Sequence, residues 1–120
     1  MKVDTSKLIF SKNGNLVYRG YYWEEKGTHC CNLEDYPGIN TLMDSKDELF
    51  KETYEILEDF IEHAIKRNNR VCLPKGTLRR KRGWEFVEFE LSPELTDRIF
   101  DYLESGGRYR YACDTSEAYQ

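Results

Sequence analysis

The chain has 120 residues, a length that suits one domain, or one domain with an appendage, and that can bury a core without disulfides. Its formal net charge is −4 with 33% charged residues, which argues against a general nucleic-acid binder and favours a basic protein as partner. Aromatic residues are abundant, with nine tyrosines, six phenylalanines and two tryptophans.

Neither export nor disulfide pairing is expected from the sequence. Residues 1–5 lack the apolar segment of a secretory signal, and no apolar run approaches the roughly 20 residues that span a bilayer. No C-x-x-C spacing occurs among the four cysteines, which are Cys30, Cys31, Cys72 and Cys113. We therefore expect a cytoplasmic protein without membrane contact, whose thiols are free and partly buried.

The first strands are predicted around a hairpin at Asn13-Gly14. This dipeptide is a two-residue turn signal, and it lies between a short strand over residues 7–10 and a long strand over residues 16–24. Gly20, inside the long strand, marks a bulge or a close approach of another backbone. Alternation assigns the large side chains to two faces, one with Leu16, Tyr18 and Tyr22 and the other with Val17, Tyr21 and Trp23.

Further strands flank the centre of the chain. Gly27 turns the chain into residues 28–33, and Pro37-Gly38 turns it into a short run over residues 39–43. After a helix, a last short strand is expected over residues 70–74. The order β-β-β-α-β predicts an α+β fold, in which a three- or four-stranded antiparallel sheet carries one long helix on one face.

That long helix is predicted over residues 45–67. Ser45 and Glu48 form a capping box, in which the hydroxyl and the carboxylate satisfy backbone amides at the helix start, and Asp44 is an alternative cap. Apolar residues recur at helical spacing along one side. The opposite side is predicted to be exposed and acidic, and it includes Glu55, Glu58, Asp59 and Glu62.

A basic connector divides the chain. It covers residues 77–83 and separates a core over residues 1–76 from a strand-helix extension over residues 84–120. Its basic run consists of Arg79, Arg80, Lys81 and Arg82. A solvated connector is the simplest interpretation of this run, and weak nucleic-acid binding is the alternative.

The extension is predicted to pack on the core or to build a homodimer. A strand is expected over residues 84–91, a helix from Ser92-Pro93 to about Glu104, and a last short strand over residues 108–113. The strand and helix together are too small to bury their own apolar side chains, and we therefore expect a homodimer, although the core is the other available surface.

The central residues resemble the HicB-like antitoxins. Asp35-Tyr36-Pro37-Gly38 stands where that family has its aspartate-x-proline-glycine turn, and residues 44–48 stand where it has its helix start. Leu73-Pro74 stands where its final strand ends. The resemblance covers roughly the N-terminal half to two thirds of the chain. It implies a partial RNase H-like fold and a protein that neutralises a small RNA-cleaving toxin by covering its basic surface.

On this interpretation the partner-binding residues are carboxylates of the helix and aromatics of the long strand. Exposed carboxylates steer a basic partner, and tyrosine and tryptophan are enriched at protein interfaces. The predicted set is Glu55, Glu58, Asp59, Glu62, Tyr21, Tyr22 and Trp23. Plain core packing is the alternative for the aromatics, and a solvated helix face is the alternative for the carboxylates.

Catalysis is not expected, and neither are a cofactor or a metal. His29 and His63 have no nucleophile at a recognisable spacing, although Cys30 and Cys31 adjoin His29. True RNase H enzymes hold metal ions with clustered carboxylates. Asp35 and Asp44 are more simply explained as a turn residue and a helix cap.

Two other functions stay open at this stage. The chain could be an orphan HicB-like domain, from a mobile element, that binds or inhibits some other protein. It could also be a nucleic-acid-binding autoregulator that uses the run from Arg79 to Arg82. HicB-like antitoxins often append a DNA-binding unit, and residues 86–107 resemble the start of a ribbon-helix-helix. Glu85, Glu88 and Glu90 disfavour groove reading by that strand.

Overall fold

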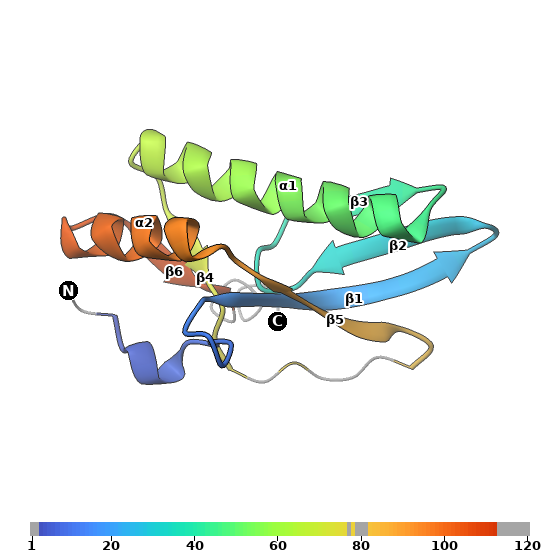
Figure 1. Ribbon diagram of the computed structural model, residues 1–120, viewed down its shortest axis with the longest axis horizontal. Helices are drawn as coiled ribbons and strands as arrows, with labels where there is room; N and C mark the ends of the chain where they lie inside the picture. Colours follow the sequence, from blue (N-terminus) through green and yellow to red (C-terminus); the bar gives the residue numbers. More distant parts are fainter. Residues whose placement is uncertain (1–2, 77, 79–81, 113–120) are drawn as a thin grey trace.

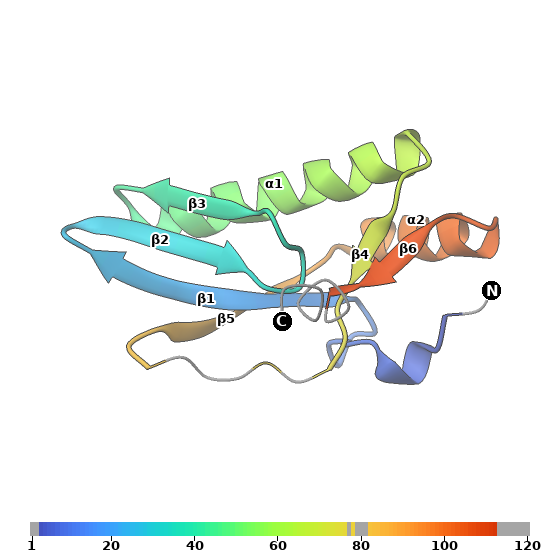
Figure 2. The ribbon, with the colours of Figure 1, turned by 180° about the vertical axis from the view of Figure 1, so that it is seen from behind.

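A computed structural model describes residues 3–76, 78 and 82–112. A four-stranded antiparallel sheet, in the order β3-β2-β1-β5, carries one long helix, and a parallel pair, β4-β6, lies at one end (Figures 1 and 2). The elements are η1 Thr5–Lys7, β1 Val17–Glu25, β2 Thr28–Leu33, β3 Asn40–Met43, α1 Lys46–Lys66, β4 Val71–Leu73, β5 Glu85–Glu90, α2 Pro93–Glu104 and β6 Tyr109–Tyr111. The predicted fold class is confirmed.

The alternation of β1 is as the sequence predicts. Tyr18 and Tyr22 belong to the main core, where the ring of Tyr22 lies 5.5 Å from that of Phe50 in α1. Tyr21 and Trp23 point to the other face and meet Trp84, which precedes β5. The two faces therefore have separate clusters of aromatic side chains.

Gly20 is the point of closest approach between β1 and β2. A Cβ at this position would collide with the backbone carbonyl of Asn32. Because the clash is with main chain, it cannot be relieved by a change of rotamer. The close approach expected from the sequence is therefore present, and glycine is required for contact rather than for a left-handed conformation.

The long helix begins and ends within one residue of its predicted bounds. Ser45 is the N-cap, and its hydroxyl accepts a hydrogen bond from the backbone N–H of Glu48. Five side chains of α1 are fully or nearly fully buried against the sheet: Leu49, Thr53, Leu57, Ile61 and Ala64. Asp44, the alternative cap, is exposed.

The C-terminal part of the chain is built into the same core. β5 pairs with β1 over the register Val17↔Glu90 to Tyr22↔Glu85, so it is an edge strand of the main sheet. Leu95, Ile99 and Leu103 of α2 are buried in the cluster that α1 covers. Core packing thus accounts for most of the apolar side chains that suggested a homodimer. The homodimer remains a prediction, but these side chains no longer support it.

Two predictions for the N-terminal region are wrong. Residues 7–10 are not a strand: residues 5–7 form a short 3-10 helix, and only single bridges follow, Leu8↔Lys75 and Phe10↔Leu16. The turn at Asn13-Gly14 is longer than two residues, because Ser11 N–H donates to the carbonyl of Asn15. Side chains explain both differences, since Asp4 caps the short helix and Asn13 and Asn15 donate to Glu90.

The strand after the long helix does not join the main sheet. β4 pairs in parallel with β6, from Val71↔Tyr109 to Leu73↔Tyr111. The parallel arrangement is possible because the connector, β5 and α2 lie between the two strands in sequence. The pair lies beside α2, at the end of the molecule away from the β1–β2 turn (Figure 2).

A buried ion pair joins β1 to two neighbouring segments. Arg19 Nε lies 2.6 Å from Asp35 Oδ2, and its Nη2 donates to Asp35 Oδ1 at 3.0 Å. The backbone N–H of Arg19 also donates to Asp35 Oδ2 at 2.8 Å. The same guanidinium donates to the carbonyl of Gly76 at 2.8 Å. Burial raises the pKa of the Asp35 carboxyl, and the hydrogen bonds from Arg19 act in the opposite direction.

We predict that Asp35→Asn costs about 3–5 kcal/mol of unfolding free energy, because it leaves the Arg19 charge buried without its partner. Urea unfolding measures the change. The double variant Arg19→Met, Asp35→Asn should be more stable than the single variant, since no uncompensated charge remains. Asp44→Asn, at an exposed carboxylate, is the control and should change stability by less than about 0.5 kcal/mol. A small effect of Asp35→Asn would show that the pair is not a main determinant of stability.

Candidate protein-binding surface

Among the described residues, the histidines and cysteines do not come together as a nucleophile and a base. His29 Nδ1 is 2.6 Å from Tyr22 Oη and 3.7 Å from Glu24 Oε2, whereas His63 is exposed near the end of α1. Cys30 and Cys31 are buried, and burial raises the pKa of both thiols, that of Cys31 to about 11. Across the part of the chain that the structure describes, no group of three or more His, Cys, Asp or Glu side chains could hold a metal ion.

Asp35 and Asp44 differ from their predicted roles. Asp35 is more than a turn residue, because its carboxylate is buried and fully engaged with Arg19. Asp44 is exposed, and Ser45 takes the capping position. The two carboxylates that flank β3 therefore serve different purposes and do not converge on one site.

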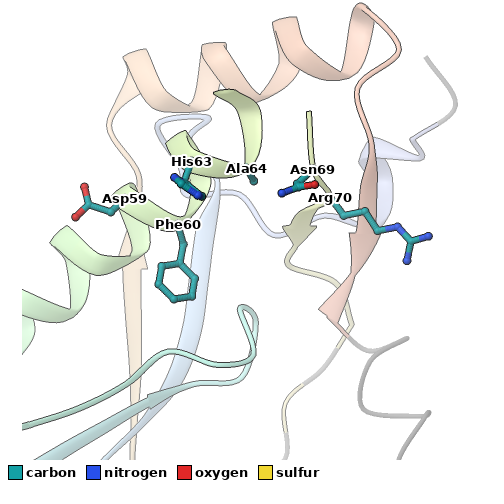
Figure 3. A pocket seen from close by; sticks show the side chains of 6 residues that line it. All are labelled: Asp59, Phe60, His63, Ala64, Asn69 and Arg70. Carbon is teal, nitrogen blue, oxygen red and sulfur yellow. The ribbon is translucent and has the colours of Figure 1, made fainter. Parts of the chain in front are cut away.

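A hollow of about 430 Å³ lies at the C-terminal end of α1. Phe60, Ala64 and Asn69 line it, together with His63. Asp59 and Arg70 lie at opposite ends and extend away from each other (Figure 3). Because its two charged groups do not converge, the hollow offers no paired charges to fix the orientation of a small molecule.

The acidic side of α1 is the most distinctive charged surface. Glu55, Asp59 and Glu62 are exposed, and Glu58 is half-buried on the flank that faces α2. Glu62 Oε1 accepts from Arg98 at 2.7 Å. Burial raises the pKa of the Glu58 carboxyl, and the charges of Glu62, Asp59 and Glu55 raise it further. The three neighbouring carboxylates are therefore close enough to oppose the ionisation of Glu58.

The predicted aromatic residues are less exposed than the predicted carboxylates. Tyr21 and Tyr22 are buried, which favours core packing, the alternative given for them above: Phe86 packs against Tyr21 and Phe50 against Tyr22, on opposite faces of the sheet. Trp23 is half-buried and stacks on Trp84, with ring centres 4.1 Å apart and an angle of 9° between the rings. Of the aromatic set, Trp23 alone stays accessible, at the margin of an aromatic cluster.

Most of the basic run lies outside the described residues. Arg79, Arg80 and Lys81 are outside the described residues, and Arg82 is exposed. The residues before the run are fixed to the sheet, since Arg19 holds the carbonyls of Lys75 and Gly76. Weak nucleic-acid binding by this run stays a prediction.

Sequence reasoning missed two features of the surface. Trp84 is 36% exposed although it stacks on Trp23, and Leu42 on β3 is 70% exposed. A signal was present for Trp84, because it directly follows the turn Arg82-Gly83 and precedes an alternating strand. For Leu42 the signal was the short length of its strand, which is typical of a sheet edge.

Comparison with known proteins gives no assignment. No protein-family model, curated protein or solved structure matches the chain. The HicB-like resemblance therefore rests on the turn, helix-start and strand-end residues alone. Within the described residues, no helix is both long and apolar enough to cross a membrane.

We predict that Cys31 of the native protein reacts very slowly with iodoacetamide. With a pKa of about 11, roughly a thousandth of the thiol is ionised at pH 8, against about a quarter for a free cysteine. Peptide mapping by mass spectrometry, before and after unfolding in urea, follows each cysteine separately. Rapid native labelling of Cys31 would contradict the buried, protonated thiol and reopen a nucleophilic role.

Proposed function

We propose that this chain is a protein-binding domain of the antitoxin type, which covers a small basic partner such as an RNA-cleaving toxin. The observation that carries the proposal is the crowding of carboxylates on the exposed side of α1. The HicB-like resemblance suggests the class of partner. In this proposal the protein acts in the cytoplasm, no residue is catalytic, and neutralisation results from surface complementarity.

The carboxylates are spaced so that each opposes its neighbours. Glu55 and Asp59, like Glu58 and Glu62, are four residues apart and therefore adjacent on the helix surface. Like charges at this spacing destabilise a helix by roughly 0.2–0.5 kcal/mol per pair. A cationic partner converts the repulsion into attraction, so the same arrangement that weakens the free helix favours the complex.

Most of this charge is not neutralised within the described chain. Within the described residues, Glu62 forms an ion pair with Arg98, and both side chains are about half exposed. Exposed pairs contribute little to stability, so this pair can exchange for a contact with a partner at low cost. The surface is thus available for electrostatic steering, which raises association rates more than it strengthens the final complex.

Two alternatives differ in what they bind. An orphan HicB-like domain would bind a protein that is not encoded beside it, whereas an antitoxin is expected beside the gene of a small basic toxin. An autoregulator would bind nucleic acid through the run from Arg79 to Arg82, with an affinity that falls steeply as salt rises. Affinity capture from the native host separates these cases by the charge and chemical class of what is recovered.

We predict that the double charge reversal Glu55→Lys, Asp59→Lys slows association with the basic partner recovered in that capture. The association rate should fall by roughly tenfold or more at low salt, and its dependence on salt should become weaker, because the steering charge is removed. The dissociation rate should change less. Surface plasmon resonance at two salt concentrations measures both rates.

The matched control is Asp101→Lys, Glu104→Lys, which makes the same change in net charge on exposed positions of α2. It should leave most of the association rate intact. Equal effects of the two double variants would show that only net charge matters and would remove α1 as the binding surface. Recovery of an acidic protein would contradict electrostatic covering altogether.

A further inference from the structure

The two edges of the main sheet are protected to different degrees against pairing with other strands. β5, at one edge, carries Glu85, Glu88 and Glu90, and all three are exposed. β3, at the other edge, has no charged residue from Asn40 to Met43. Charges on an edge strand discourage pairing with other strands. The edge formed by β3 lacks this protection.

The hydrogen bonds to β2 show which backbone groups of β3 point outward. Leu33 N–H donates to the carbonyl of Ile39 at 3.0 Å, so Ile39 directs its backbone groups toward β2. Because direction alternates along an antiparallel strand, Thr41 and Met43 also face β2. The N–H and C=O groups of Asn40 and Leu42 therefore point to the free edge.

The side chains of the same two residues are also open. Leu42 is 70% exposed, the highest value among the exposed large apolar side chains, and Asn40 is exposed as well. Both lie on the sheet face opposite α1, because Leu42 pairs with Cys30 and Cys30 pairs with Trp23. An apolar side chain and unpaired backbone groups thus coincide on one short strand.

We propose that β3 pairs with β3 of a second copy of this chain, antiparallel, about a two-fold axis that passes beside Thr41. In this register Asn40 lies opposite Leu42 of the second copy, and Leu42 lies opposite Asn40 of the second copy. All outward N–H and C=O groups of these residues then find partners. The two four-stranded sheets become one continuous sheet.

A second copy is the occupant that the charges of the strand favour. In a symmetric pairing each residue meets residues of the same strand, and β3 brings no like charges together because it has none. The equivalent pairing of β5 would bring several glutamates together. In the proposed register Leu42 lies beside Asn40 of the second copy and loses part of its 70% exposure.

Cysteine cross-linking tests the register. Asn40→Cys and Leu42→Cys are made separately in a background of Cys30→Ala and Cys113→Ser. Cys30 is removed because it lies on β2 directly opposite Leu42. On oxidation, a mixture of the two variants should form a disulfide-linked dimer, since directly opposed residues have Cα atoms about 5.5 Å apart. Each variant alone should cross-link at least tenfold less, because its two copies lie roughly 8–9 Å apart.

A mixture of Glu88→Cys and Glu90→Cys, on the other edge strand, reports random collision and should resemble the single variants. Equal cross-linking in all samples would overturn the proposal. Stronger cross-linking of Leu42→Cys alone than of the mixture would overturn the register about Thr41.

Sedimentation velocity tests the dimer without introduced cysteines. The wild-type chain should sediment as a dimer at tens of micromolar, and Leu42→Lys, which places a charge on the edge, should sediment as a monomer. At a concentration low enough for the wild type to be monomeric, the two should have the same thermal midpoint. Leu42→Pro should also be monomeric, because it removes an outward N–H that β2 does not use. A monomeric wild type, or dimers in both variants, would overturn the proposal.

Discussion

The ion pair between Arg19 and Asp35 determines how three separate segments meet. Arg19 lies near the start of β1, Asp35 lies in the turn between β2 and β3, and the carbonyls of Lys75 and Gly76 follow β4. The backbone carbonyl of Arg19 also accepts from the N–H groups of Glu34 and Asp35. One residue therefore satisfies polar groups from all three segments, and its bonds to Asp35 are buried. A buried charge tolerates few alternative geometries, so the pair contributes specificity as well as cohesion.

Around this pair, the two faces of the sheet carry different cores. On one face α1 and α2 cover Tyr18, Tyr22 and the apolar side chains of β2 and β5. On the other face Trp84 folds over Trp23 and Tyr21. Arg19 holds Lys75 and Gly76, the two residues that precede the connector. The two proposed binding surfaces lie on the outer side of α1 and along the edge at β3.

The sequence contained enough information for the elements whose signals are local. Capping at Ser45 and Ser92 and helical spacing located both helices, and the period-2 pattern assigned the faces of β1. The same helical period placed Glu55, Asp59 and Glu62 on the exposed side. Each of these results depends on residues within a few positions of one another, where the backbone geometry fixes the direction of each side chain.

The remaining features depend on contacts between distant residues. Nothing near β4 indicates that it pairs with β6 rather than with the main sheet, because the choice of a strand partner is made in three dimensions. Arg19, in an alternating strand, has the pattern of a surface residue until Asp35 is brought to it. The burial of Tyr21 and Tyr22 has a similar origin, since Phe86 and Phe50, which cover them, come from other elements.

The position of β5 beside β1 has a consequence for synthesis on the ribosome. Val17 pairs with Glu90, so one whole edge of β1 lacks its neighbour until most of the chain has been made. At translation rates of about 5–20 residues per second, β1 and β2 wait on the order of several seconds for that strand. During this interval the aromatic residues of β1 and an unpaired edge are exposed together. The nascent chain therefore passes through a stage in which association with other chains, or with a chaperone, competes with completion of its own sheet.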